Sequence, residues 1–289
     1  MKVRTRLREL IAARAIVVAP GAYDAFSAKL IETVGFEAVY MTGFGTAASV
    51  LGLPDIGLLT MTEMAANAKR LADIVNIPVI ADADTGYGNH LNVMRTVEEY
   101  EKAGVAAIQI EDQVSPKRCG HMGGHKLISA EEMGSKIGAA VRARKDKDMV
   151  LIARTDAISA EGFDEAIRRG NIYREEGADL LFIEAPTNMD QLASIPKLIN
   201  GPALINIAPK TPYLRVSRYE EMGYAMAIYP PICITTAYRA IKEELTELKA
   251  KGMNEDGGHG GVSFDELVEF LGLSKYRTLE EELLKDPKK

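Results

Sequence analysis

Short runs of apolar residues recur along the chain and alternate with longer stretches of mixed polarity. Four runs share one pattern, in which a helix end leads through a glycine into small and branched apolar residues: 31–42, 100–111, 173–184 and 219–230. Glycine suits the left-handed position just past a helix, because it adopts that conformation without strain. Four further apolar runs complete a set of eight predicted strands: 15–20, 76–84, 148–156 and 201–209.

The stretches between the strands have apolar residues at helical spacing. This spacing predicts helices over 22–34, 62–75, 93–103, 130–144, 163–176 and 235–251. Nearly continuous apolar strands that alternate with helices are typical of a parallel sheet buried on both faces. Eight such units in about 250 residues favour an α/β fold of the (β/α)8 TIM-barrel type over a doubly wound sheet. We therefore expect one domain over residues 1–289, with a helical extension over about 252–289 that is available to pack on a partner subunit.

Composition and charge exclude several classes of protein. The 289 residues are 47% hydrophobic and 26% charged, as in ordinary globular proteins. A formal charge of -6 without a basic block argues against nucleic-acid binding, and no apolar run approaches the roughly 18 residues of a membrane span. Two cysteines provide no disulfide framework. We expect a cytoplasmic metabolic protein with no membrane partner.

The basic start of the chain, residues 1–14, lacks the apolar segment of a secretory signal. Its spacing predicts an amphipathic helix with Leu7, Leu10 and Ile11 facing inward. A short transit peptide is the alternative.

Polar side chains stand at the carboxyl ends of six predicted strands, where TIM-barrel enzymes keep their active sites. They are Tyr40, Thr42, Asp82, Asp84, Glu111, Arg154, Glu184 and Asn206. The strand interiors are apolar, so these residues break the pattern only where a barrel site would lie. Their coincidence is the strongest indication of function from the residues alone.

Asp82 and Asp84 lie two residues apart on a predicted strand, so their side chains point to the same face. Their charges would repel unless a cation joins them or one carboxyl stays protonated. With Asp55, Glu111 and Glu184 available, they predict an oxygen-rich site for Mg²⁺ or Mn²⁺. The structural alternative is that Asp84 caps the next segment and Asp55 is a turn residue.

The loop after the fourth predicted strand, KRCGHMGGHK, carries a thiol at Cys119. Positive charge at Lys117, Arg118 and His121 would lower the pKa of this thiol and suit it to act as a nucleophile or proton donor. Gly120 and two further glycines suit a lid that excludes water.

Two other interpretations of this loop stay open. It is either a flexible surface turn, or a zinc site formed by Cys119, His121 and His125. The second is disfavoured because no other cysteine lies nearby.

The expected ligand is a carboxylate rather than a sugar phosphate. A buried Arg154 either clamps a ligand carboxylate by a two-pronged contact or forms a structural ion pair with Glu184, and the spacing favours neither. The ends of the seventh and eighth predicted strands lack the glycine-rich phosphate grip of sugar-phosphate barrels.

The turn at 40–49 contains Gly-x-Gly but no Rossmann fingerprint. The Thr42 hydroxyl and the amides of Gly43 and Phe44 could cradle a carboxylate or a developing oxyanion. Tyr40 could donate to the same oxygen. A tight turn between strand and helix is the alternative.

Five motifs together resemble the isocitrate lyase/PEP mutase superfamily, in order and spacing, from about residue 5 to 250: PGAYDAFSAKL, MTGFGTAASVLGLPD, IADADTGYGN, EDQVSPKRCGH and ARTDA. The Lys-Arg-Cys-Gly-His loop looks like its carbon–carbon lyase branch. The resemblance implies a TIM barrel whose last helix swaps between the subunits of a homodimer or homotetramer.

The resemblance also implies a role for each matching position. The implied metal ligands are Asp82, which would bind Mg²⁺ directly, and Asp55, Asp84 and Glu111, which would hold its waters; Mn²⁺ is an alternative. Cys119 would be the proton donor and Arg154 the carboxylate clamp. The other residues expected to contact the substrate or support catalysis are Tyr40, Thr42, Gly43, Phe44, Lys117, Arg118, Gly120, His121, Glu184 and Asn206.

The implied reaction is a metal-dependent retro-aldol cleavage of a substituted 2-hydroxy dicarboxylate. The apolar sequence Pro230-Pro231-Ile232 after the eighth predicted strand suits a methyl group, which favours 2,3-dimethylmalate as substrate, giving pyruvate and propionate. The alternatives are 2-methylisocitrate cleavage, a carboxyphosphonoenolpyruvate mutase, an oxaloacetate hydrolase, and a non-catalytic protein that binds metal and carboxylate.

Overall fold

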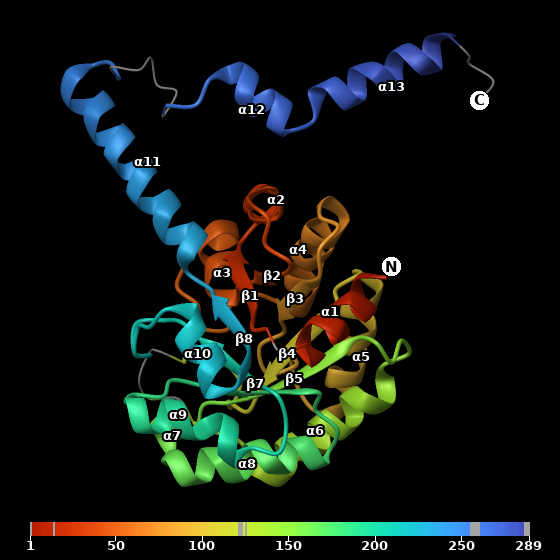
Figure 1. Cartoon of the computed structure of the whole chain (residues 1–289), viewed down its shortest axis with the longest axis vertical. Helices are drawn as coiled ribbons and strands as arrows, with labels where there is room; N and C mark the ends of the chain where they lie inside the picture. Colours follow the sequence, from red (N-terminus) through yellow and green to blue (C-terminus); the bar gives the residue numbers. More distant parts are fainter. Residues whose placement is uncertain (1, 14, 121–123, 125, 255–260, 286–289) are drawn as a thin grey trace. The chain divides into compact units, whose positions relative to one another are not determined.

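The computed structural model describes residues 2–13, 15–120, 124, 126–254 and 261–285 (Figure 1). The chain divides into two compact units, Met1–Ile234 and Thr235–Lys289. Residues His121 and His125, which the sequence singles out, lie outside the described residues.

Eight parallel strands close into a barrel in sequence order, so the predicted TIM barrel is confirmed. The strands are β1 (Val17–Ala22), β2 (Val39–Met41), β3 (Val79–Asp82), β4 (Ala107–Glu111), β5 (Val150–Thr155), β6 (Leu180–Ile183), β7 (Ala203–Asn206) and β8 (Tyr224–Tyr229). Closure is made by β8 against β1, with Val17 opposite Met226 and Pro20 opposite Tyr229. Parallel closure brings all eight carboxyl ends to one rim.

The six predicted helices are present, each with ends within a few residues of the prediction. They are α2 (Ala25–Val34), α4 (Met61–Ile74), α5 (His90–Lys102), α6 (Ala130–Ala143), α8 (Phe163–Glu175) and α11 (Ile232–Lys251). The helical spacing did not predict α7 (Ala157–Ala160), α9 (Met189–Leu198) or α10 (Val216–Met222).

A further helix, α3 (Gly43–Leu51), stands where a tight turn was the alternative. Thr42 is its N-cap, and its side-chain oxygen accepts a hydrogen bond from the Gly45 amide at 3.2 Å. The Gly-x-Gly sequence is therefore the first turn of a helix, whose amides point toward the rim of the barrel.

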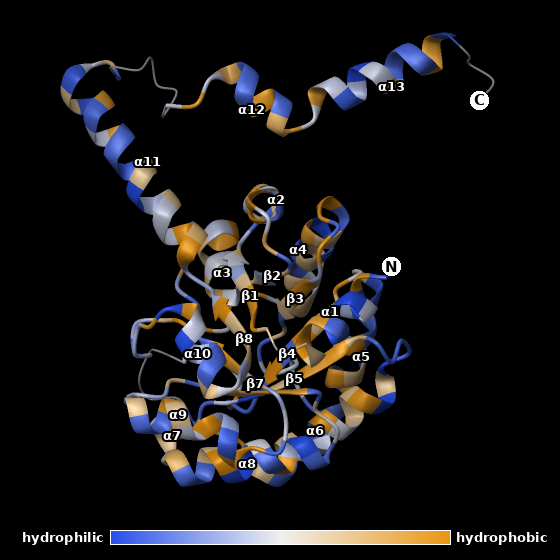
Figure 2. Ribbon diagram, viewed as in Figure 1, coloured by the Kyte–Doolittle hydropathy of each residue, from blue (hydrophilic) through white to orange (hydrophobic). Residues whose placement is uncertain are grey.

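Apolar side chains form two buried clusters, one inside the barrel and one between the strands and the outer helices. In Figure 2 the strands are mostly coloured as hydrophobic, whereas the outer helices carry both hydrophobic and hydrophilic residues. The predicted amphipathic helix is α1 (Val3–Ala12), and Leu7 on it is fully buried against the residues of the barrel interior. Arg4 on the same helix donates to the backbone oxygens of Glu101 and Val105 at 2.6 and 2.9 Å. Helix α1 therefore covers the end of the barrel opposite the rim that carries the polar residues.

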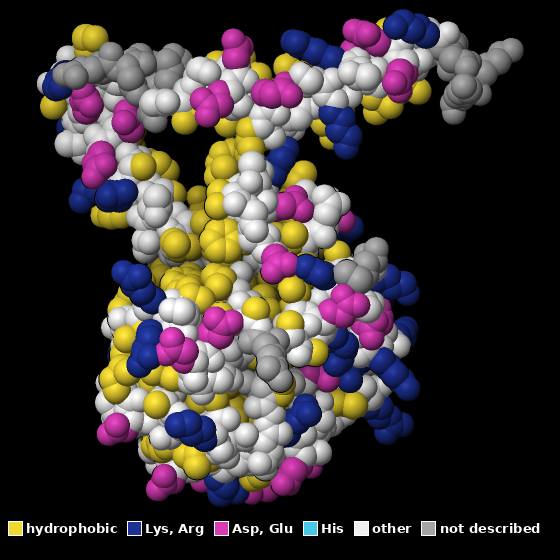
Figure 3. Space-filling view, viewed as in Figure 1, with side chains coloured by type: hydrophobic (Ala, Val, Ile, Leu, Met, Phe, Trp, Pro, Cys, Tyr) yellow, Lys and Arg dark blue, Asp and Glu magenta, His cyan; other side chains and the backbone are white. Residues whose placement is uncertain are grey.

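The second unit continues α11 and adds α12 (Phe264–Phe270) and α13 (Leu273–Lys285). Neither α12 nor α13 buries a side chain, and apolar residues such as Phe264, Tyr276 and Leu284 are 65–77% exposed (Figure 3). Assembly into a homodimer or homotetramer through these faces stays a prediction. No described helix is long and apolar enough to cross a membrane, and a cytoplasmic location stays a prediction as well.

The buried contact of α1 predicts a large effect of Leu7→Ala on stability. Removing a fully buried leucine side chain leaves a cavity and costs about 2–5 kcal/mol of the free energy of unfolding. Leu91→Ala is the matched control, because Leu91 is 74% exposed on α5 and should change stability by less than about 0.5 kcal/mol. Urea denaturation measures both, and equal effects would show that α1 does not support the barrel.

Candidate active site

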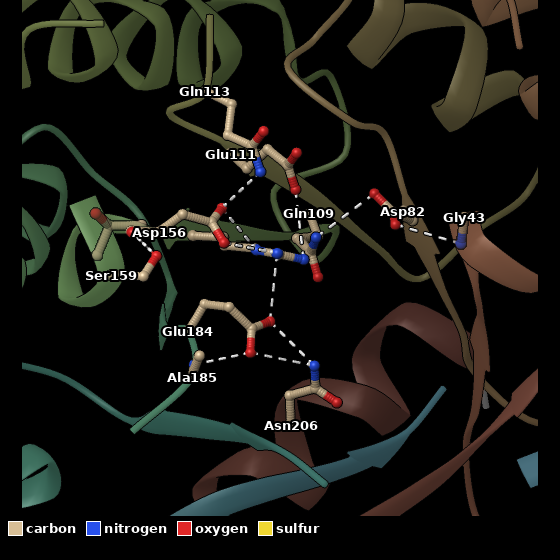
Figure 4. A network of polar contacts seen from close by, with 12 residues as sticks. Gly43, Asp82, Gln109, Glu111, Gln113, Asp156, Ser159, Glu184, Ala185 and Asn206 are labelled. Atoms are coloured by element: carbon tan, nitrogen blue, oxygen red, sulfur yellow. Dashed lines mark hydrogen bonds and ion pairs between the residues drawn. The ribbon is translucent and has the colours of Figure 1, made fainter. Parts of the chain in front are cut away.

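The rim residues predicted from the strand ends lie together, and Asp82 stands among the most constrained of them. Its Oδ1 accepts from the Asp84 amide at 3.0 Å. The same oxygen accepts from Gln109 Nε2 at 3.5 Å (Figure 4). Its Oδ2 accepts from the Gly43 amide at 3.3 Å, at the N-terminus of α3. Three donors, one of them at the N-terminus of α3, therefore fix the orientation of the Asp82 side chain.

Gly43 is needed for this approach, since a Cβ there would lie 2.5 Å from Asp82 Oδ2. The Gly43 amide therefore donates to Asp82. The same amide is part of the cradle predicted for a ligand carboxylate, so this donor already has a partner. Phe44 follows as the second residue of α3 and is half-buried. The Tyr40 hydroxyl donates to Gln109 Oε1 at 2.9 Å, so Tyr40 contacts Asp82 through Gln109.

Asp84 adopts a left-handed backbone conformation, with φ of 47°. This conformation is strained for a residue other than glycine, and side chains from α5 hold the backbone in it. The Tyr100 hydroxyl donates to the Asp82 carbonyl at 3.1 Å, and the Thr96 hydroxyl donates to the Gly86 carbonyl at 3.1 Å. The loop that carries Asp84 is therefore fixed by side chains of α5 as well as by the contacts of Asp84 with Asp82 and Lys117.

Lys117 lies among the acidic residues. Its ammonium group is 2.7 Å from Asp55 Oδ1 and 2.8 Å from Asp84 Oδ1, and its side chain is 4% exposed. Burial alone would lower the Lys117 pKa, but the Asp84 and Glu111 carboxylates hold it well above its usual range. Lys117 is therefore a permanent counter-cation, and Asp55 is more than a turn residue.

Arg154 forms the second centre of positive charge. Its Nη2 is 2.8 Å from Asp156 Oδ1 and 3.4 Å from Glu184 Oε2, and its Nη1 is 3.4 Å from Glu111 Oε2. Asn206 Nδ2 donates to both oxygens of Glu184 at 3.0 and 3.3 Å. The ion pair with Glu184, one of the two alternatives left open by the sequence, is present, but Asp156 is the nearer partner.

The rim carries more buried negative charge than these two cations balance. Among the described residues, Lys117 and Arg154 form ion pairs with a buried acidic set: Asp55, Asp84, Glu111, Asp156 and Glu184, with Asp82 beside them. Burial raises the pKa of Asp84 to about 6, against the opposing effect of Lys117. Burial also raises the pKa of Glu111 well above its ordinary range, although Arg154 opposes this.

These residues fit a hard divalent cation. The Glu111 Oε1 atom is buried and has no hydrogen-bond partner among the described residues, and the donors nearby are carboxylate oxygens, which Mg²⁺ and Mn²⁺ prefer. Among the described residues, no three Asp, Glu, Cys or His side chains lie close enough together to hold a metal ion as they stand. This agrees with the position of the Lys117 ammonium between Asp55 and Asp84.

The thiol segment approaches the same rim. The Cys119 amide donates to the Asp55 carbonyl at 3.1 Å, and Cys119 is half-buried. The Arg118 side chain is exposed, whereas Gly120 is buried. His121 is outside the described residues, so its predicted role and the alternative zinc site are not tested.

Residues 7–249 match the phosphoenolpyruvate phosphomutase family. The chain belongs to this family. It is 49% identical over 286 residues to 2,3-dimethylmalate lyase of Eubacterium barkeri, which covers 97% of this chain and 98% of that one. It is 43% identical over 279 residues to 2-methylisocitrate lyase of Aeropyrum pernix, covering 96% of this chain and 90% of that one.

A crystal structure of 2,3-dimethylmalate lyase superposes with a TM-score of 0.92 at 38% identity, covering 98% of this chain and 95% of that chain. The resemblance predicted from the motifs is thereby confirmed. As a member of the phosphoenolpyruvate phosphomutase family with these relatives, the chain is an enzyme, and the lyase reaction type agrees with them.

Sequence reasoning missed four buried polar residues of this site: Gln109, Asp112, Gln113 and Asp156. Gln109 interrupts the apolar strand AIQIE, which was the available signal. Asp112, Gln113 and Asp156 follow directly on strand ends, as the recognised residues do. Their contacts join different strands, and spacing along one strand does not reveal them.

The position of Lys117 predicts that its charge is needed for folding. Lys117→Met leaves buried carboxylates without their partner, which costs about 3–5 kcal/mol of unfolding free energy. Lys69→Met is the control, because the exposed pair of Lys69 with Asp73 contributes less than about 1 kcal/mol. Urea denaturation in EDTA at pH 8 compares them, and a loss at Lys117 no larger than at Lys69 would contradict the assignment.

Proposed function

We propose that this enzyme cleaves 2,3-dimethylmalate to pyruvate and propionate, with Mg²⁺ as its metal. The observation that carries this is the 49% identity to 2,3-dimethylmalate lyase over nearly the whole of both chains. The apolar residues Pro230, Pro231 and Ile232 that follow β8 support it, since a methyl-substituted substrate needs an apolar wall. The carboxylate set at the rim supports the metal.

The metal would be held by Asp82 directly and by Asp55, Asp84 and Glu111 through water. When bound, Mg²⁺ acts as a Lewis acid that lowers the energy of an alkoxide at the substrate's 2-hydroxyl oxygen. The hydrogen bonds to Asp82 from Gly43, Asp84 and Gln109 keep that carboxylate in one orientation for this purpose.

The chain's own groups then bind the substrate and move the proton. The Arg154 guanidinium orients a substrate carboxylate. The plane of this guanidinium is fixed by its ion pairs with Glu111, Asp156 and Glu184. The hydroxyl proton passes to a water molecule, the bond between C2 and C3 breaks, and the electron pair of that bond moves onto C3 as an enediolate of the departing acid. The Cys119 thiol donates its proton to C3, giving propionate, and the proton lost from the hydroxyl restores the thiol.

Cleavage of 2-methylisocitrate is the second candidate, favoured by the 43% identity to a 2-methylisocitrate lyase over most of both chains. Both substrates release pyruvate, so one assay compares them. We expect fast release from 2,3-dimethylmalate, slow release from 2-methylisocitrate, and loss of both in EDTA that Mg²⁺ restores. Release mainly from 2-methylisocitrate would overturn the proposed substrate, and release that persists in EDTA would overturn the metal.

The role of Cys119 predicts the effect of Cys119→Ser. A serine hydroxyl is a far weaker acid than a thiol, so pyruvate release should fall about 100-fold or more, the size of a lost general acid. Cys233→Ser is the matched control, because Cys233 is the second residue of α11 and packs against the apolar core, so its loss should change the rate little. Full activity of Cys119→Ser would contradict the proton-donor role.

A further inference from the structure

The side chain of Gln113 holds the backbone of the thiol segment. Its Oε1 accepts from the Arg118 amide at 2.9 Å, and its Nε2 donates to the Arg118 carbonyl at 2.8 Å. The side-chain amide of Gln113 thus pairs with both the backbone N–H and the backbone carbonyl of Arg118, the residue before Cys119. A neighbouring β-strand would make the same pair of hydrogen bonds. Gln113 itself is 1% exposed, whereas Arg118 is exposed, so the contact joins a buried side chain to the backbone of a surface residue.

The backbone of Gln113 is fixed independently of this contact. Gln113 forms an antiparallel bridge with Leu127, and the Val114 amide donates to the Lys126 carbonyl at 2.8 Å. The Ile128 amide donates to the Asp112 carbonyl at 2.9 Å. The chain on both sides of the thiol loop is therefore paired, and Gln113 reaches from this paired base into the loop.

The same glutamine contacts the partner of Arg154. Gln113 Nε2 also lies 3.3 Å from Asp156 Oδ2 (Figure 4), and Asp156 receives Arg154 Nη2 at 2.8 Å and Nε at 3.2 Å. Asp156 is held in turn by Asp112, whose Oδ1 accepts from the Asp156 amide at 3.1 Å. Asp112 Oδ2 accepts from the Tyr173 hydroxyl at 2.8 Å, which ties the arrangement to α8.

Gly120 provides a second and separate contact between the loop and this ion pair. A Cβ at Gly120 would lie 2.3 Å from Arg154 Nη2 and 2.4 Å from Asp156 Oδ1. The backbone after Cys119 therefore rests directly on the pair of Arg154 with Asp156, at a distance that no other residue type permits. Glycine is required at this position because it has no side chain, and not because of its backbone conformation.

From these contacts we infer that Gln113 is a positioning residue that sets the place of the Cys119 thiol relative to the Arg154 guanidinium. Gln113 holds the residue before Cys119, and the Arg154–Asp156 pair supports the residue after it. The thiol is thereby placed at a fixed distance from the group that orients the substrate carboxylate. Gln113 acts through its hydrogen bonds to Arg118 and Asp156.

The test measures how fast iodoacetamide alkylates Cys119, in the full chain with Cys233→Ser as background so that one thiol remains. Gln113→Leu keeps the size of the side chain and removes its hydrogen bonds, and Gly120→Ala adds the clashing Cβ. We expect both to raise the alkylation rate about tenfold, which corresponds to about 1.4 kcal/mol. The measurement is made in EDTA without substrate, with the unfolding temperature of each variant recorded.

Two matched controls separate positioning from general loosening. Gln191→Leu removes another glutamine side chain that accepts from a loop amide, that of Thr187 at 2.9 Å. Gly138→Ala adds a Cβ on α6 whose nearest neighbour would be at 3.3 Å. Both should leave the alkylation rate nearly unchanged. Should Gln113→Leu not fold, Gln113→Asn decides, because its shorter side chain cannot reach both polar groups of Arg118. Rates equal to those of the controls would overturn the inference.

The consequence for catalysis rests on the proposed function. In pyruvate release, Gln113→Leu should lower kcat about tenfold with little change in the KM for 2,3-dimethylmalate, because the substrate contacts are intact. A rise in KM with unchanged kcat would instead place Gln113 in substrate binding and overturn the positioning role. The alkylation experiment needs no turnover, so failure of the proposed substrate and failure of this inference give different results.

Discussion

The site depends on one electrostatic constraint, which is that the rim of the barrel buries more carboxylates than cations. Charge in a poorly solvated environment is tolerated only when it is paired. Lys117 and Arg154 divide the acidic residues between them, with Asp55 and Asp84 around the first and Glu111, Asp156 and Glu184 around the second. Burial raises the pKa of Asp84 to about 6 and that of Glu111 well above its ordinary range, and Lys117 and Arg154 oppose these shifts without cancelling them.

The closed barrel brings these charged groups together in one site. Strands from distant parts of the chain end at one rim, so Asp82 on β3, Arg154 on β5 and Asn206 on β7 meet although they are far apart in sequence. The outer helices then fix the groups from behind, as Tyr173 on α8 does for Asp112. A divalent cation fits the remaining charge, and a dicarboxylate substrate fits the combination of a metal with Arg154.

Much of this was predictable because it depends on local patterns. Strand runs, helical spacing and glycines past helix ends are properties of short segments, so the barrel and the rim residues could be predicted. The N-terminus of α3 at Gly43 and the position of the Lys117 ammonium could not, because each is decided by contact with a carboxylate on another strand. The pairing of Gln113 with Arg118 was likewise hidden, since it depends on how a loop folds back on its own base.

The central claim is that the surplus carboxylates bind one divalent cation through Asp82. Calorimetric titration of Mg²⁺ and Mn²⁺ into the metal-free protein tests this directly, with Asp82→Asn and Asp73→Asn compared, since Asp73 lies in an exposed surface pair. The account predicts one ion bound per chain, lost in Asp82→Asn and retained in Asp73→Asn. Failure of the parent protein to bind either ion, or equal binding by Asp82→Asn, would contradict it.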